Sequence, residues 1–343
     1  MSSRPIAVLG TGLVTSVGLT TAACCCAIRA KISNPVETRF IDSGGAGIMA
    51  HQVSLDRPWP GLTKLVKMAA LAIEEALQGL DKDKWHLLPL LLCVAEAQRP
   101  GRMAGLDDKL LTLIQTEVGV SFAQASALVP HGRVAVAVAL SQARTLLESS
   151  KIPGVLIVAA DSLLSWPTLC RYEREDRLLT ESNSNGFMPG EGAGALWVGA
   201  VESRPTQLLC SGIGFGREPA HIDSGEPLRA DGLTQAIKAS LDDGGRQLHD
   251  MDFRITDNSG EQYYFKEASL VISRTLRQRK EEFDIWHPAE CIGEAGAASG
   301  IAVIATAREA CLKGYAPGRN ILTHWANDAG PRAAVTLEFR GAA

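Results

Sequence analysis

Two patterns of apolar and polar positions alternate through the first 200 residues of the chain. Short apolar runs bounded by glycine, proline or polar residues indicate buried strands, and apolar residues three and four positions apart indicate helices. They predict strands at 6–14, 88–95, 155–160 and 192–198, and helices at 20–30, 64–78, 107–117 and 134–148. The last helix contains a Val-Ala-Val-Ala alternation, but Leu140, Ala143 and Leu147 continue on helical spacing, so we interpret it as buried.

The remainder of the chain repeats this succession of strands and helices. Its apolar pattern predicts strands at 207–215, 252–256, 320–325 and 333–339, and helices at 233–248 and 295–313. Gly212, Gly214 and Gly216 close its first strand much as Gly10 and Gly12 close the first strand of the chain. We therefore predict an α/β protein of two similar halves, 1–203 and 204–343, with mostly parallel sheets covered by helices.

A polar stretch at 165–189 lies between two predicted strands of the first half. It has no clear helical or strand periodicity, and an irregular segment of that length inside a compact domain usually has a function. We expect a functional lid or a subunit contact there.

Composition excludes several classes of protein. The chain has 343 residues, a net charge of −4 and 46% hydrophobic residues, without a basic stripe that would indicate nucleic-acid binding. Neither a signal peptide nor a membrane-spanning run is evident, so we expect a cytoplasmic protein. The eight cysteines show no Cys-x-x-Cys spacing, which argues against zinc and a disulfide scaffold. Cys24, Cys25 and Cys26 point to different faces of a helix, so we expect small packing residues.

Several segments resemble the β-ketoacyl-acyl-carrier-protein synthases, which belong to the thiolase superfamily. Residues 6–18 are similar to the opening strand and loop of that family, and 155–164 to the strand and turn after its nucleophile helix. Arg177-Leu-Leu-Thr followed by Asn185-Gly-Phe-Met-Pro-Gly-Glu-Gly-Ala-Gly-Ala resembles its Asp-Gly-Phe and glycine-rich turn. Residues 291–300 resemble its Gly-His-x-x-Gly-Ala-Ala-Gly loop. The resemblance covers nearly the whole chain and weakens after about Arg217.

The resemblance implies a thiolase-like, five-layer αβαβα fold with two pseudo-symmetric halves. It also implies a dimer, either of two identical chains or of this chain with a ketosynthase-like subunit. A protein partner or an acyl carrier protein is a further expected partner. We expect no cofactor, no metal, no nucleic acid and no membrane as binding partners.

The condensing residues of the family are a cysteine and two histidines. The cysteine should stand at the turn into the helix 134–148, because a helix N-terminus favours the thiolate. The sequence there is Ala127-Leu-Val-Pro-His-Gly-Arg-Val, which puts His131 at or next to the cysteine position. The nearest cysteines are Cys93 and Cys170. His131 is either a substitute base or nucleophile, or a polar residue that closes the start of the helix.

The two histidine positions are also changed. Asn258 approximately takes the place of the first, and an amide donates a hydrogen bond but does not titrate near neutral pH. Glycine spacing places Gly293 at the second, with Glu294 beside it, and a carboxylate would repel a malonyl group. No member of the catalytic set is therefore intact.

Other ionisable residues could form a different site at the junction of the halves. The candidates are His131, Asp257, Glu261, Glu294, His287 and His324. A histidine beside a carboxylate would suit hydrolysis or acyl transfer, but no serine elbow motif is present. Gly10-Thr-Gly12 lacks the spacing of a dinucleotide loop, and the 190–194 glycines lack a phosphate-loop lysine, so we interpret both as packing glycines.

Two hypotheses follow for function. The first is a catalytically inactive ketosynthase-like protein that acts as a binding or accessory partner, for example an adaptor in a bacterial biosynthetic or effector-secretion gene cluster. The second is an atypical acyltransferase, or a 3-oxoacyl-carrier-protein synthase type of enzyme, that acts on acyl thioesters with non-standard residues.

Overall fold

A computed structural model describes residues 4–203 and 205–341 of the chain. The first half contains, in chain order, β1 (Ile6–Val14), α1 (Thr21–Arg29), β2 (Val36–Ile41), β3 (Gly47–Ala50), α2 (Gly61–Ala76), the 3-10 helix η1 (Lys82–Leu87), β4 (Leu90–Cys93), α3 (Leu110–Val118), β5 (Ala127–Val129), the 3-10 helix η2 (Gly132–Val134), α4 (Ala135–Ser149), β6 (Val155–Ser162), α5 (Trp166–Arg174) and β7 (Glu191–Gly199).

The second half contains β8 (Gln207–Arg217), α6 (Asp231–Asp243), η3 (Leu248–Asp250), β9 (Phe253–Thr256), α7 (Gln262–Thr275), β10 (Ile285–Trp286), α8 (Ala289–Ile292), η4 (Gly296–Ala298), α9 (Ser299–Leu312), β11 (Asn320–Ala326) and β12 (Pro331–Arg340). The predicted boundary between 203 and 204 falls at Arg204, which lies outside the described residues.

Ten of the strands form one hydrogen-bonded sheet in which each half has the same order. From the centre outward the first half runs β1-β7-β6-β4-β5 and the second β8-β12-β11-β9-β10. In both halves the two inner pairs are antiparallel and the two outer pairs are parallel. Only Ile6, Ala7 and Val8 of β1 pair with β8 at the centre. The two halves are thus pseudo-symmetric, as predicted, but the sheet is mixed rather than mostly parallel.

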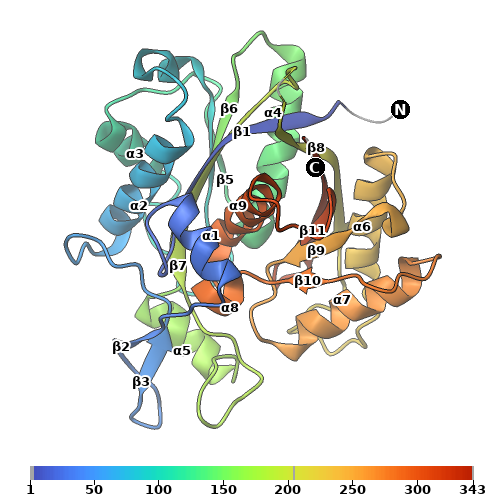
Figure 1. The fold of residues 1–343 in the computed structure, drawn as a ribbon. Coiled ribbons are helices and arrows are strands. Elements are labelled where there is room, and N and C mark those ends of the chain that lie inside the picture. The colour runs from blue at the N-terminus through green and yellow to red at the C-terminus, as the bar shows by residue number, and fades with distance from the viewer. Residues whose placement is uncertain (1–3, 204, 342–343) are drawn as a thin grey trace.

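Alternate residues of the strands face two different layers of helices. In β6, Ile157 packs in the central core with α4 and α9, whereas Val158 packs in the core beneath α2 and α3. In β11, Ile321 joins the same central core, whereas Leu322 faces α6 and α7. Helices α4 and α9 therefore lie between the two halves of the sheet, with α2 and α3 on one side and α6 and α7 on the other (Figure 1). This is the predicted five-layer αβαβα arrangement.

The glycines within β1 and β8 allow a very close approach of helices. A Cβ on Gly10 or Gly12 would overlap backbone carbonyl oxygens of α2, and one on Gly212, Gly214 or Gly216 would overlap those of α6. The same close contact between strand glycines and a helix thus occurs at the same place in both halves. These glycines serve packing, as the sequence predicted, because the space that a nucleotide would need is filled by a helix.

The structure corrects several details. The stretch 165–189 is not irregular throughout, because α5 begins there with the Ser165 side chain accepting a hydrogen bond from the Thr168 N–H. The sequence did not predict α7 or the β2–β3 hairpin. Helix α6 ends at Asp243, five residues before the predicted end at 248, because Gly245 has a left-handed φ of 63°. Cys24 and Cys25 are buried as expected, but Cys26 is exposed.

None of the helices in the described residues is long and apolar enough to span a bilayer. Over the same residues, no group of three or more His, Cys, Asp and Glu side chains is arranged to hold a metal ion.

Candidate functional site

The turn into α4 is where the family resemblance places the nucleophile. It is formed by Gly132, Arg133 and Val134, which make one 3-10 turn before the helix. The His131 side chain is exposed, whereas the Arg133 side chain is only 8% exposed. Arg133 is therefore the side chain that enters the junction of the two halves, and His131 lies outside it.

Arg133 reaches across the junction to the second half. Its guanidinium donates to a Glu294 carboxylate oxygen at 3.0 Å, to the Tyr264 hydroxyl at 2.8 Å and to Asp328. Asp257 lies 3.9 Å from its Nε. Burial of a charge is costly unless it is paired and hydrogen-bonded, and every one of these contacts offsets that cost.

Asp328 is the centre of this arrangement. Its carboxylate accepts from Arg133, from Arg177 at 2.8 and 3.2 Å, from the Tyr264 hydroxyl and from the Tyr172 hydroxyl at 3.2 Å. Burial alone would raise the pKa of Asp328, but the two guanidinium groups hold it below its ordinary value. Asp328 therefore remains ionised at neutral pH and binds the two arginines together.

Three further ion pairs extend the cluster. Arg177 pairs with both oxygens of Glu261 at 2.7 and 2.8 Å. Arg99 donates to Asp161 at 2.6 Å and to Glu96 at 2.8 Å. We call the whole set the junction cluster; it consists of Arg99, Arg133 and Arg177 with Glu96, Asp161, Asp257, Glu261, Glu294 and Asp328.

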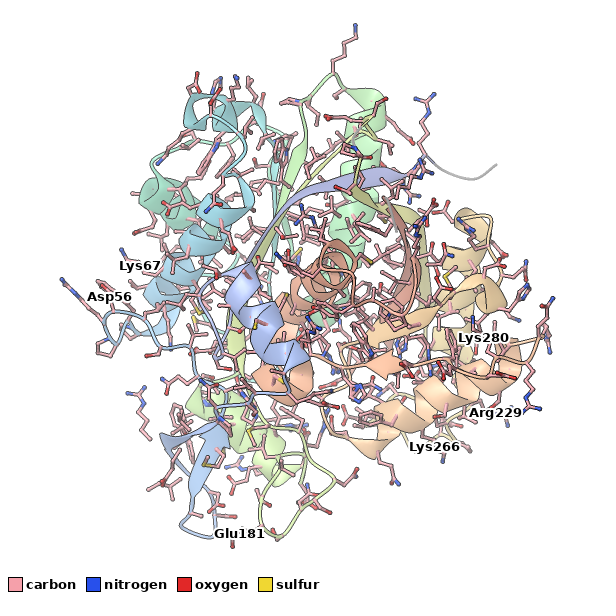
Figure 2. The ribbon with its side chains drawn as sticks, viewed as in Figure 1. Asp56, Lys67, Glu181, Arg229, Lys266 and Lys280 are labelled. Carbon is pink, nitrogen blue, oxygen red and sulfur yellow. The ribbon has the colours of Figure 1, made fainter. Side chains whose placement is uncertain are left out.

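The junction cluster fills the space around it. The cavity lined by Arg99, Arg133, Arg177 and Glu294 has a volume of about 10 Å³ open to water. That is about the space of a single water molecule, and far below the size of a site for a small ligand. Charged groups in folded proteins usually lie at the outer edge, where Figure 2 shows Asp56, Glu181 and Arg229. The junction cluster is a concentration of charge in the interior instead.

The N-termini of the two central helices are each occupied by a side chain of the opposite half. The Asn327 Oδ1, just after β11, accepts from the Arg133 N–H at 2.9 Å, at the start of α4. The Asp161 Oδ2, near the end of β6, accepts from the Ala297 N–H at 2.9 Å, at the start of α9. A helix N-terminus attracts an anion through such free N–H groups. At α4 one of these donors is already used by Asn327.

Glu294 is held in the junction cluster by four donors. Besides Arg133, it accepts from the Ser259 hydroxyl at 3.1 Å, the Gly296 N–H at 2.9 Å and the Ser299 hydroxyl at 3.4 Å. Every donor is a group of the protein itself. Glu294 is thereby fixed as a structural carboxylate and is not directed at an open pocket.

Gly293 has a left-handed φ of 69°, and a Cβ there would contact the ring of His51 and the Met188 carbonyl oxygen. The buried His51 lies 3.3 Å from the Ser16 hydroxyl through its Nδ1. Burial lowers the pKa of His51 to about 4, so the ring is neutral. No motif in the sequence pointed to His51, which lies outside the lining of the junction cavity.

Asp257 and Asn258 follow β9 and are both buried. Burial raises the pKa of Asp257 to about 7, although Arg133 lowers it and the Ala326 N–H donates to its carboxylate at 3.1 Å. The Asn258 Nδ2 has no hydrogen-bond partner within the described residues. Asp257 thus belongs to the junction cluster, whereas Asn258 is not among the residues that line the cavity.

Of the six candidate ionisable residues, the structure brings together the three carboxylates Asp257, Glu261 and Glu294. It does not bring the histidines to them. The His287 Nε2 lies 3.1 Å from Glu290, and His324 is buried in β11 with a pKa lowered to about 3 by burial. The histidine–carboxylate pair that acyl transfer would use is therefore not assembled among these residues.

No protein-family model and no curated protein sequence matches the chain. Solved structures do match it over nearly its full length. A complex of a type II PKS acyl-carrier protein with its ketosynthase bound to the hexaketide matches with a TM-score of 0.81 and 16% identity, over 98% of this chain and 99% of the other. The ishigamide ketosynthase/chain length factor matches with a TM-score of 0.80 and 18% identity, over 98% and 99%.

A ketosynthase in complex with its chain length factor from Xenorhabdus doucetiae matches with a TM-score of 0.70 and 11% identity, over 98% of each chain. Identities this low establish the fold alone. The chain has the α/β fold of the ketosynthases and chain length factors, with a mixed sheet.

Proposed function

We propose that this chain is a ketosynthase-like subunit that does not condense acyl groups itself and acts by binding a second chain of the same fold. The observation that carries the proposal is the junction cluster. Arg133, Glu294 and Asp328 meet at the junction of the two halves, beside the turn into α4 where the resemblance expects the cysteine. Arg133 pairs with both carboxylates, and the cavity that the cluster lines has a volume of only about 10 Å³.

The charge of the cluster also argues against a condensing reaction. Three arginines face six carboxylates, of which Asp257 has a pKa raised to about 7 by burial. A malonyl thioester brings a further carboxylate, which would have to displace an ion pair and enter an acidic site. The cavity, with a volume of about 10 Å³, has no room for contacts that would offset the cost of displacing an ion pair.

Cys93, the nearest cysteine before the turn, does not replace the missing nucleophile. It is completely buried in β4, and burial raises its pKa well above the ordinary value. A thiol is reactive as its thiolate, so a raised pKa makes Cys93 inert.

Pairing with a ketosynthase-like subunit is supported by what two of the matched structures contain. Each is described as a ketosynthase with a chain length factor. An adaptor role in a bacterial biosynthetic or secretion gene cluster is also compatible with a chain that does not condense acyl groups. We favour the ketosynthase-like partner because the fold similarity extends over 98% of the chain.

The experiment has two arms. The purified chain is incubated with acyl-CoA and acyl-carrier-protein thioesters, and free thiol is followed over time beside an active ketosynthase. The chain is also co-expressed with ketosynthases encoded in its own genome and purified through a tag on the partner. The proposal predicts no thiol release above the uncatalysed rate, and co-purification in equal amounts.

Turnover that is lost in His131→Ala or Glu294→Gln would refute the proposal and establish the atypical acyltransferase. If the chain neither releases thiol nor binds a ketosynthase, the proposed pairing is refuted, and only the proposed lack of condensing activity stands.

A further inference from the structure

A cavity with apolar and aromatic walls lies away from the junction cluster. It is enclosed by the end of α1, by β10 and α8, and by α9, and its volume is about 220 Å³. At about 30 Å³ per water molecule this is room for roughly seven waters. Its lining consists of Ile28, Arg29, Lys31, Trp286, His287, Pro288, Cys291, Thr306 and Tyr315. The space is an order of magnitude larger than the junction cavity.

One wall of this cavity is a rigid aromatic surface. The rings of Trp286 and Tyr315 lie 6.2 Å apart between centroids and 21° from parallel. Phe253 also packs against Trp286, with ring centroids 4.8 Å apart and ring planes 51° apart. Since Trp286 is fixed by strand β10 and by Phe253, the wall is preorganised for a flat apolar group.

The mouth of the cavity carries positive charge. The Arg29 guanidinium lies 4.2 Å above the centre of the Tyr315 ring and, within the described residues, has no carboxylate partner. Lys31 is neutralised by its ion pair with Glu290. No Asp or Glu belongs to the lining itself. A ligand with an apolar body and one negative charge would therefore match the cavity.

His287 supplies an unsatisfied polar atom. Its Nε2 lies 3.1 Å from a Glu290 oxygen, which places the ring hydrogen on Nε2 and leaves the lone pair on Nδ1. Burial lowers the pKa of His287, so the ring is neutral and Nδ1 is an acceptor. This atom is buried and, within the described residues, has no partner. Because a water molecule cannot reach this atom, a ligand in the cavity cannot reach it either, so His287 lines the cavity without offering it a hydrogen-bond acceptor.

We propose that this cavity binds a small aromatic carboxylate. The ring packs on Trp286 and Tyr315, and the carboxylate pairs with Arg29. This site is separate from the junction cluster and goes beyond the proposed function, since ligand binding here requires no partner chain and no chemistry.

The test uses the full chain and three probes of similar shape. Phenylacetate has the aromatic ring and the negative charge; cyclohexylacetate has the charge without the aromatic ring; phenethylamine carries a positive charge instead of the carboxylate. Binding is measured by calorimetry and by the fluorescence of Trp286, with Trp286→Phe to assign the signal. The expected order is phenylacetate, then cyclohexylacetate about tenfold weaker, with no binding of phenethylamine.

Two variants and a matched control separate the contacts. Arg29→Gln is expected to weaken both acids about tenfold, and Tyr315→Leu to reduce the preference for the aromatic ring. Arg57→Gln is the control, because Arg57 also lies over an aromatic ring, that of Trp59, but on another face. Equal binding of phenethylamine, or no binding of either acid at millimolar concentration, would overturn the proposal. So would an Arg29→Gln variant that binds like the wild type.

Discussion

Replacement of Arg133 by methionine tests the energetic role of the junction cluster. The change keeps much of the side-chain length and removes the guanidinium, so Glu294 loses its 3.0 Å partner and Asp328 keeps only Arg177 among its cations. Removal of one partner from a buried ion pair typically costs about 3–5 kcal/mol, because a charge remains buried without compensation. We expect the free energy of unfolding to fall by about that amount.

The assay is urea denaturation followed by circular dichroism, with Arg246→Met as the matched control. Arg246 pairs with Glu338 at 3.2 Å, but its side chain is 34% exposed, so its loss is expected to cost less than about 1 kcal/mol. The double variant with Glu294→Gln should recover part of the loss, because it removes the orphaned charge. Equal destabilisation by Arg133→Met and Arg246→Met would show that the buried ion pairs contribute no more to stability than the exposed one.

The effect of Arg133→Met should also depend on pH. The pKa of Asp328 is held below its ordinary value in the folded protein, so this group contributes stability above about pH 4, near the unfolded-state pKa. The contribution is lost as the pH falls toward the folded-state pKa. At neutral pH the Arg133→Met variant lacks part of the stability that Asp328 contributes to the wild type. The difference in the free energy of unfolding between the two proteins should therefore narrow below about pH 4.

Further predictions concern packing, protonation and thiol reactivity. Gly214→Ala should destabilise the fold by about 1–3 kcal/mol, since its Cβ would overlap the backbone of α6, while Gly225→Ala, in open space, should have almost no effect in the same urea titration. Asp257 has a folded-state pKa raised to about 7, so the stability it contributes is full below about pH 4 and is lost as the pH rises through 7. Asp257→Asn should flatten that decline between pH 5 and 8, and an unchanged slope would contradict the assignment. Iodoacetamide should label the exposed Cys26 in the native protein and leave Cys93 unmodified, which peptide mass spectrometry can check.

Much of the architecture was predictable because apolar periodicity reports burial directly. The core strands and the two central helices have buried faces made of Ala, Val, Leu and Ile, and their positions agree with the sequence to within a few residues. The glycines of β1 and β8 were also recognisable, since both halves place them at the same point. Helix α7 was missed because it mixes aromatic, charged and polar residues, and its buried Glu267 breaks the apolar pattern.

The junction cluster could not be predicted because the sequence gives no sign of its pairings. Arg133 and Asp328 are 195 residues apart, and charged residues are ordinarily assigned to the surface. A weak signal did exist: Arg133 stands alone between a glycine and a long apolar run. His131 drew the prediction because histidine is a common catalytic residue, but the structure exposes it and buries Arg133 two positions later.

If the junction holds ion pairs and no nucleophile for acyl groups, the chain forms no acyl-enzyme. Intact-mass spectrometry after incubation with acyl-carrier-protein thioesters measures this, with Cys26→Ser to remove the exposed thiol. We expect an unchanged mass, while an active ketosynthase treated in parallel gains one acyl group. A stable increase of one acyl group, mapped to a residue at the turn into α4, would show that the junction holds a nucleophile after all.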